Sequence, residues 1–186
     1  LYPRWYSDMT QQTLGFTLSD WQQAYQQEGL APAAVLGALR NELSTDDNAW
    51  ISLASEAQLN EQLAALDERL QQVEGNVASL PLYGVPFAVK DNIDAAGWDT
   101  TAACPAFAHQ ASADATVVAR LRAAGAILIG KTNLDQFATG LVGTRSPYGA
   151  VSNSFNAGYV SGGSSSGSAS VVARGLVPFA LGTDTA

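Results

Sequence analysis

The sequence is poor in cysteine, histidine and basic residues, and each shortage argues against a class of protein. One cysteine, Cys104, in 186 residues excludes an internal disulfide framework and suits a reducing, cytoplasmic compartment. Nine Lys and Arg against seventeen Asp and Glu give a net charge of -8, which argues against nucleic acid and anionic membrane surfaces as partners. The single histidine, His109, has no second metal-ligand type beside it, so we expect it to lie at the surface without a metal.

Long apolar runs are also missing. Each run is interrupted by Gly, Pro or a charged residue within about ten residues, so no segment is predicted to span a bilayer. The first five residues lack the apolar region of a signal peptide, and a chain that begins with Leu is expected to be a fragment or a trimmed chain. A hydrophobic content of 47% with 14% charged residues describes a well-buried globular protein with one core.

Residues 1–75 are predicted to form a helical segment. A capped helix is expected to begin at Thr17 and end at Gly29, and a second helix to begin at Pro32. Residues 48–53 (NAWISL) suit a short strand. Residues 56–73 carry apolar side chains at helical spacing, which predicts an amphipathic helix. Its expected buried stripe consists of Leu59, Leu63, Leu66, Leu70 and Val73.

From residue 76 the pattern changes to strand, helix, strand. An apolar strand ends on Lys90, a helix capped by Asp114 is expected to run to Gly125, and residues 126–130 (AILIG) indicate a buried strand. Another short helix is expected to begin at Thr132 and Asn133. This order predicts an α/β fold with a mixed sheet flanked by helices, whose core occupies residues 76–186.

Glycine and serine are concentrated in residues 161–168 (SGGSSSGS). Glycine is costly inside helices and strands, so this stretch is predicted to be a loop that passes close to another group and then starts a helix near Ser168. Ser165, Ser166 and Ser168 are expected to cap that helix. The stretch also matches G-x-S-x-G, the nucleophile elbow of α/β-hydrolases, but that fold needs a histidine after the serine, whereas His109 precedes it.

Lys90 is the strongest single candidate for chemistry. At the end of an apolar strand its ammonium loses water, which lowers its pKa and allows the neutral amine to act as a base toward a hydroxyl. Lys131 also follows an apolar strand, but a solvated lysine beside a helix is expected there. Cys104 has no histidine nearby in sequence, and inert packing is expected.

Four motifs, taken together, resemble the amidase signature family in order and spacing. They are residues 84–92 (GVPFAVKDN), 125–133 (GAILIGKTN), 162–168 (GGSSSGS) and 181–184 (LGTD). Residues 101–107 (TAACPAF) and 135–149 (DQFATGLVGTRSPYG) are similar to the versions found in its allophanate hydrolase branch. The resemblance is dense over residues 80–186 and looser before them, and it implies the N-terminal part of the amidase-signature fold.

The resemblance also implies a Lys-Ser-Ser triad. Carried over by motif, the lysine is Lys90 and the bridging serine, which follows an unusual cis peptide bond in this family, is Ser164. The nucleophilic serine belongs to a G-T-D-x-[GA]-G-S run, of which residues 182–186 supply the first five positions, so it is expected two residues past Ala186. Backbone amides at Thr185 and Ala186 are expected in the oxyanion hole. The 186 residues alone are therefore expected to be inactive.

The resemblance implies an amide substrate and no metal or organic cofactor. The expected reaction is hydrolysis of allophanate in urea degradation, with an acyl-enzyme and release of ammonia and carbon dioxide. Residues expected to line the substrate are Gly143, Arg145, Tyr148 and Ser165. The implied partners are the small-molecule amide, a biotin-dependent urea carboxylase linked in function, and a second copy in a homodimer.

Two alternatives remain open from the sequence. The chain could be an inactive fragment or scaffold that holds a small anion at the helix N-terminus near Ser168. It could also belong to a general amidase or an amidotransferase subunit that acts on a larger amide. Ammonia release from allophanate, compared with longer amides, separates these readings.

Overall fold

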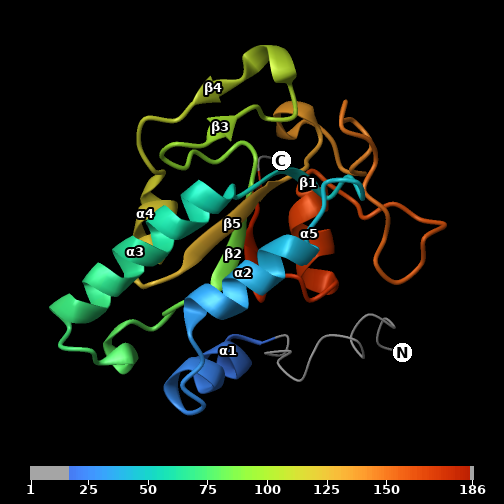
Figure 1. The fold of residues 1–186 in the computed structure, drawn as a ribbon. Helices are drawn as coiled ribbons and strands as arrows, with labels where there is room; N and C mark the ends of the chain where they lie inside the picture. The colour runs from blue at the N-terminus through green and yellow to red at the C-terminus, as the bar shows by residue number, and fades with distance from the viewer. Residues whose placement is uncertain (1–16, 185–186) are drawn as a thin grey trace.

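The computed structural model describes residues 17–184, so Thr185 and Ala186, the predicted oxyanion-hole residues, lie outside the described part. A four-stranded sheet in the order β1-β5-β2-β6 forms its centre (Figure 1). Strand β2 runs parallel to both β5 and β6, whereas β1 is antiparallel to β5. The mixed sheet predicted from the strand-helix-strand pattern is therefore confirmed. The strands span Trp50–Leu53 (β1), Pro86–Lys90 (β2), Ile127–Thr132 (β5) and Phe179–Leu181 (β6).

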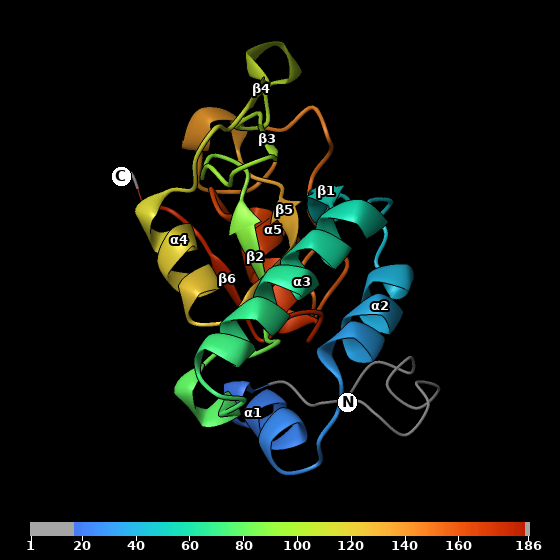
Figure 2. The ribbon, with the colours of Figure 1, turned by 60° about the vertical axis from the view of Figure 1, so that its left-hand side comes forward.

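Helices cover both faces of this sheet. Figure 2 shows α3 in front of the central strands and α5 behind them. Strands β2 and β5 are buried along their whole length, as expected for strands covered on two faces. The helices are Leu18–Gln26 (α1), Pro32–Glu42 (α2), Glu56–Gln72 (α3), Thr116–Ala123 (α4) and Ser166–Ala173 (α5). Short 3-10 turns occupy Val77–Ser79, Pro105–Phe107 and Gln136–Ala138, and a two-strand ribbon pairs Asp99–Thr100 (β3) with His109–Gln110 (β4).

Two of the predicted N-terminal helices, α1 and α3, begin at a capping box, whereas α2 begins at Pro32 without a side-chain cap. Thr17 and Asp20 make a capping box at α1, and Ser55 and Gln58 make another at α3. Leu59 and Leu66 of α3 are buried, and the other members of the predicted stripe are partly buried against the same core. The apolar spacing of residues 56–73 thus gives the helix and its buried face.

Residues on both sides of position 75 contribute to one hydrophobic cluster. Trp21 of α1 and Leu36 of α2 belong to the same buried core as Phe87 of β2. The phenolic hydroxyl of Tyr25 also donates a hydrogen bond to the carbonyl of Gly84, just before β2. The proposed division at residue 75 therefore separates segments of sequence that pack together.

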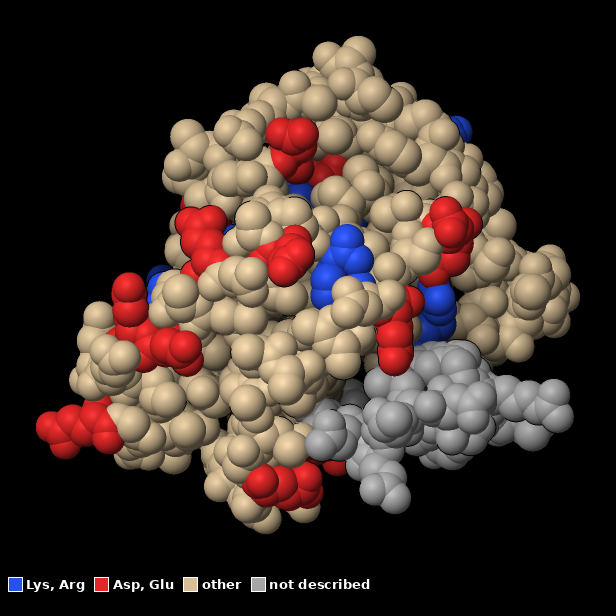
Figure 3. Space-filling model, in the orientation of Figure 1, with Lys and Arg blue, Asp and Glu red and all other residues tan. Residues whose placement is uncertain are grey.

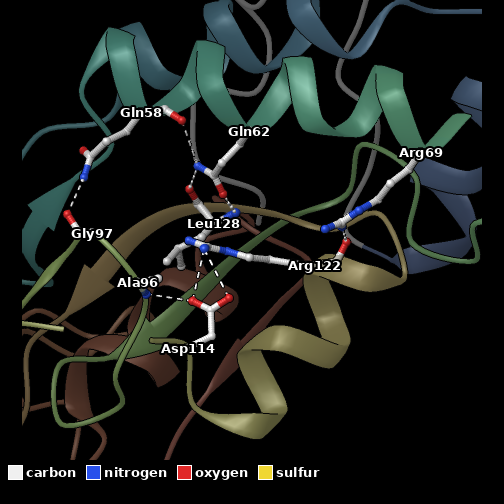
Figure 4. Close-up of polar contacts among 8 residues, drawn as sticks. All are labelled: Gln58, Gln62, Arg69, Ala96, Gly97, Asp114, Arg122 and Leu128. Atoms are coloured by element: carbon white, nitrogen blue, oxygen red, sulfur yellow. Dashed lines mark hydrogen bonds and ion pairs between the residues drawn. The ribbon is translucent and has the colours of Figure 1, made fainter. Parts of the chain in front are cut away.

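Two predicted helix starts are wrong. Helix α4 begins at Thr116 without a side-chain cap, because the Asp114 carboxylate instead accepts a hydrogen bond from the Ala96 amide and pairs with Arg122 (Figure 4). No helix begins at Thr132 and Asn133, since β5 continues through Thr132 and the Asn133 amide group donates to two loop carbonyls.

The surface carries scattered charge. On the face in Figure 3, acidic side chains lie singly over the surface and Lys and Arg are few, so that face has no basic patch. No helix within residues 17–184 is long and apolar enough to cross a bilayer.

Candidate active site

Lys90 and Ser164 come together at the end of the central strand. Lys90 is the last residue of β2 and is fully buried. Its Nζ lies 2.6 Å from the Ser164 Oγ, which belongs to the turn before α5. Because β6 runs parallel to β2, the chain that leaves β6 brings Thr183 to the same point, with its Oγ1 2.7 Å from the Lys90 Nζ. The two residues assigned to the triad by motif are thus in hydrogen-bond contact.

The turn that carries Ser164 depends on glycine. The peptide bond between Gly163 and Ser164 is cis, as the resemblance implies for this position. A Cβ at Gly163 would collide with the Asp135 carboxylate and lie 2.6 Å from the Gly143 nitrogen. The backbone of this turn therefore passes closer to its neighbours than any larger residue allows.

Asp135 is a structural member of the site that the sequence analysis did not single out. Its buried carboxylate accepts hydrogen bonds from the backbone amides of Gly143 at 3.0 Å and Arg145 at 2.8 Å. Its own amide donates to the Ser164 carbonyl at 3.0 Å. Asp135 thus ties the 140–149 loop to the Ser164 turn. Its position shortly after a buried strand that ends beside Lys90 is the sequence signal that could have found it.

Burial and charge act on Lys90 in opposite directions. Loss of water lowers the pKa of Lys90, while the negative charges of Asp135 and Asp184 raise it; the net shift is downward. A lowered pKa increases the neutral fraction of the amine near neutral pH, and only the neutral amine can accept a proton from Ser164. The direction agrees with the expectation from the apolar strand.

Helix α5 corrects the prediction for the Gly/Ser stretch. It begins at Ser166 and includes Gly167 and Ser168, so glycine and serine do enter a helix here. Gly167 is required because a Cβ there would collide with the Ala49 carbonyl and lie 2.6 Å from the Asn133 nitrogen. The helix packs against these backbones more closely than a side chain permits.

The predicted serine caps are not made. Ser165 is the N-cap residue, but its hydroxyl forms no capping bond and instead contacts both the carbonyl and the amide of Thr183 at 3.3 Å. The Ser168 hydroxyl contacts Thr132 Oγ1 at 2.7 Å and the Leu181 carbonyl at 2.9 Å. These serines join α5 to the strands and to the segment after β6.

An open cavity of about 480 Å³ borders Ser164. It is large enough for a small-molecule ligand. Of the predicted substrate-lining residues, Ser165 lines this cavity. Its wall also includes residues 161–163, Leu141, Thr183 and Asp184.

The other predicted lining residues lie elsewhere. Gly143 is buried, and its backbone packs against the carbonyl of Gly162. Arg145 is exposed and lines a neighbouring depression with Phe137. Tyr148 is half-buried and packs against the small cluster around Leu134. Within residues 17–184, these three are not brought to the cavity wall beside Ser164.

A second buried lysine overturns a prediction. Lys131 is fully buried inside β5 rather than solvated beside a helix. Its Nζ lies 3.1 Å from Asp91 Oδ1 and donates to Thr100 Oγ1 and the Asp99 carbonyl, each at 2.8 Å. Burial lowers the pKa of Lys131, and the charge of Asp91 opposes that shift. The lysine can be buried because segments remote in sequence supply an anion and two acceptors.

His109 and Cys104 play no part in the cavity wall. His109 is exposed on β4, 3.6 Å from Asp94, and Cys104 is half-buried. The histidine that a nucleophile elbow would need is therefore not supplied by His109. Among residues 17–184, no group of three or more His, Cys, Asp or Glu residues is arranged to hold a metal ion.

The sequence is similar to those of known proteins over most of its length. The family model described as Amidase matches residues 37–186. The urea amidolyases of Lachancea kluyveri and Saccharomyces cerevisiae are 56% and 55% identical over 96% and 97% of this chain. The chain spans about a tenth of the length of each of these relatives.

Solved structures give the same result. The Kluyveromyces lactis allophanate hydrolase matches 94% of this chain with a TM-score of 0.84 and 52% identity, and 28% of that protein's chain is covered. The Kluyveromyces lactis urea amidolyase matches with a TM-score of 0.85 and 53% identity over 94% of this chain and 10% of its own. The motifs, the shared fold and a family match over residues 37–186 together show that the chain belongs to the amidase family.

Proposed function

We propose that the protein is an amidohydrolase that hydrolyses allophanate and that Lys90 and Ser164 carry its proton transfers. The observation that carries the proposal is the 2.6 Å contact between a buried lysine amine and a serine hydroxyl at the edge of an open cavity. High identity to proteins named urea amidolyase, and to one named allophanate hydrolase, supports allophanate over other amides.

The proposed reaction begins with proton transfer. Neutral Lys90 takes the hydroxyl proton of Ser164, and Ser164 takes a proton from the nucleophilic serine, which the family pattern sets two residues past Ala186. That serine attacks the amide carbonyl of allophanate, the C–N bond breaks, and the leaving nitrogen takes a proton to form ammonia. Water then hydrolyses the acyl-enzyme, and the carboxylated product loses carbon dioxide.

Backbone amides at Thr185 and Ala186 are proposed to stabilise the oxyanion that forms on the carbonyl. Such a donor contributes about 3 kcal/mol, or roughly a hundredfold in rate. Ser165 is proposed to border the substrate, because it lines the cavity next to Ser164. Contacts of Gly143, Arg145 and Tyr148 with the substrate remain predictions, since these three residues lie outside the wall of this cavity.

A functional link to a urea carboxylase is part of the proposal. The same segment matches a protein titled allophanate hydrolase and a much longer protein titled urea amidolyase from one organism. We infer that allophanate made by a biotin-dependent carboxylase is the substrate supplied to this site. A cytoplasmic location and a homodimer remain predictions.

Ammonia release by the full-length protein tests the proposal. Lys90→Ala and Ser164→Ala are each expected to reduce allophanate hydrolysis by at least about a thousandfold while the protein stays folded. Near-normal turnover in either variant would reject the assignment. Faster hydrolysis of longer amides than of allophanate would instead favour a general amidase.

A further inference from the structure

Thr183 offers the Lys90 amine two hydrogen-bond acceptors, its side-chain hydroxyl and its backbone carbonyl. Besides Ser164 Oγ at 2.6 Å, the Lys90 Nζ contacts the Thr183 Oγ1 at 2.7 Å and the Thr183 carbonyl at 3.3 Å. A charged lysine has three N–H donors, so each of its hydrogens has one acceptor here. Two of the three acceptors belong to a single residue that no motif assignment gives a role.

The neutral amine has two N–H donors and one lone pair. The Thr183 carbonyl can only accept, so it holds one N–H of Lys90 in either protonation state. The second N–H and the lone pair must be divided between two hydroxyls, those of Thr183 and Ser164. Proton transfer from Ser164 requires the lone pair to face Ser164.

Asn92 favours that arrangement. Its amide nitrogen donates to the Thr183 Oγ1 at 3.2 Å, from the loop after β2. With the Lys90 Nζ on another side, the Thr183 oxygen is approached by two N–H donors and has two lone pairs to accept them. Thr183 then keeps its N–H bond from Lys90, and the position that changes on proton transfer is the one facing Ser164.

Ser165 fixes the position of Thr183 relative to the Ser164 turn. Its hydroxyl contacts both backbone groups of Thr183 at 3.3 Å, and it is the next residue after Ser164. The distance between Thr183 and the Ser164 turn is therefore set by the backbone as well as by Lys90. Lys90, Thr183 and the Ser164 turn are therefore joined by one hydrogen-bond network.

We propose that Thr183, with Asn92 behind it, is a positioning residue that directs the Lys90 lone pair toward Ser164. The inference rests on the proposed function, because it assumes that Lys90 accepts the Ser164 proton. Three other charged groups are relevant to the amine: Asp135 and Asp184, which raise its pKa, and Asp91, the next residue in the chain, which is paired with Lys131. A substitution that removes the Thr183 hydroxyl leaves these three carboxylates in place, so the charges near the amine are unchanged.

The test uses Thr183→Val in the full-length enzyme, with ammonia release from allophanate measured against pH. We expect kcat to fall about tenfold to a hundredfold with little change in KM, because the base is present but poorly oriented. The acid limb of kcat/KM should move to lower pH, since the ammonium form loses one of its three acceptors. A lower kcat together with an acid limb at lower pH would show that the lysine is misoriented. A general loss of structure would not produce this combination.

Three further variants complete the test. Thr183→Ser keeps the hydroxyl and should restore both the rate and the acid limb. Asn92→Leu does not touch Lys90 and should lower kcat by about fivefold, the effect of one hydrogen bond. Thr100→Val is the matched control, because Thr100 is a buried threonine that accepts from the other buried lysine, Lys131, at 2.8 Å; its folded fraction should keep the wild-type pH profile.

Each outcome decides between the two proposals. If Lys90→Ala is inactive but Thr183→Val keeps the wild-type kcat and acid limb, the positioning role is wrong and the proposed function stands. The same acid-limb shift in Thr100→Val would also overturn it. If Thr183→Val does not fold, an unchanged kcat in folded Asn92→Leu overturns it. Activity in Lys90→Ala would instead reject the proposed function.

Discussion

Lys90, at the end of β2, and Lys131, near the end of the neighbouring β5, are both buried, but their amines have different partners. The Lys90 Nζ makes hydrogen bonds to hydroxyl and carbonyl oxygens of Ser164 and Thr183, while the Lys131 Nζ lies 3.1 Å from the Asp91 carboxylate. Burial lowers the pKa of both, so their folded pKa values lie below the unfolded value. Between those values the unfolded chain binds more protons, and the free energy of unfolding therefore rises with pH through that window.

Lys131→Met is expected to destabilise the protein strongly. Removing the lysine leaves the Asp91 carboxylate buried without its counter-charge, which typically costs about 3–5 kcal/mol. Chemical denaturation of the full-length protein measures the loss. The double variant Lys131→Met with Asp91→Asn should recover part of it, since no charge then remains unpaired. A single variant as stable as wild type would show that the pair contributes nothing.

At the scale of elements, α3 completes the edge of β5 with a side chain. Strand β1 pairs with β5 only as far as Gly130, and the Ala54 amide then donates to the Ile129 carbonyl. The next residue, Leu128, makes two hydrogen bonds to the side-chain amide of Gln62 (Figure 4). Its carbonyl accepts from the Gln62 Nε2 and its backbone amide donates to the Gln62 Oε1, each at 2.9 Å. The side chain of a helical glutamine thus makes the two hydrogen bonds that a neighbouring strand would otherwise make to Leu128.

Gln62→Leu is expected to lower the free energy of unfolding by about 1–3 kcal/mol. The leucine would pack in the same space but leave the Leu128 amide and carbonyl without these partners. Thermal and urea unfolding measure the change. Gln71→Leu, at an exposed position of the same helix, is the control and should be close to neutral. Equal stability of the two variants would contradict this role of Gln62.

At the scale of the whole molecule, the helical N-terminal segment and the strand that carries Lys90 share one core. Leu36 in α2 is fully buried in the cluster that also contains Phe87 and Val89 of β2. Loss of packing in α2 should therefore reach the site, although neither α1 nor α2 borders the cavity. The division at residue 75 does not predict independent folding of its two sides.

Leu36→Ala is expected to cost about 2–5 kcal/mol and to lower the temperature at which amide hydrolysis is lost. Circular dichroism and residual activity, measured after the same heating steps, should fall together. Leu141→Ala, at a side chain that is 75% exposed, is the control and should leave the melting temperature nearly unchanged. Loss of helical signal without loss of activity would show that the two segments are independent.

Local patterns predict the elements well and the pairing of charges poorly. The leucine spacing predicts α3, the apolar runs predict β2 and β5, and the motifs predict that Lys90 meets Ser164. Composition and spacing miss the burial of Lys131, because its partners come from residues about 30 to 40 positions earlier.

The same limit applies to Asp135 and Thr183. Their importance depends on backbone amides and an amine that the fold brings to them from other loops, so no periodicity in the sequence marks them. The misplaced caps have a related cause. Asp114, Ser165 and Ser168 are suitable caps locally, but tertiary partners take their hydrogen bonds.

The burial of β2 on both faces has a consequence for the way in which the protein would lose activity. Burial is the main cause of the lowered pKa of Lys90. A slight separation of the strands around it, too small to unfold the protein, would let solvent reach the amine, raise its pKa and favour the charged form. The proton transfer proposed for Lys90 would then slow while the protein kept its native fold. The central strand is thus a barrier against hydration as much as a support, and inactivation by mild loosening should come before melting.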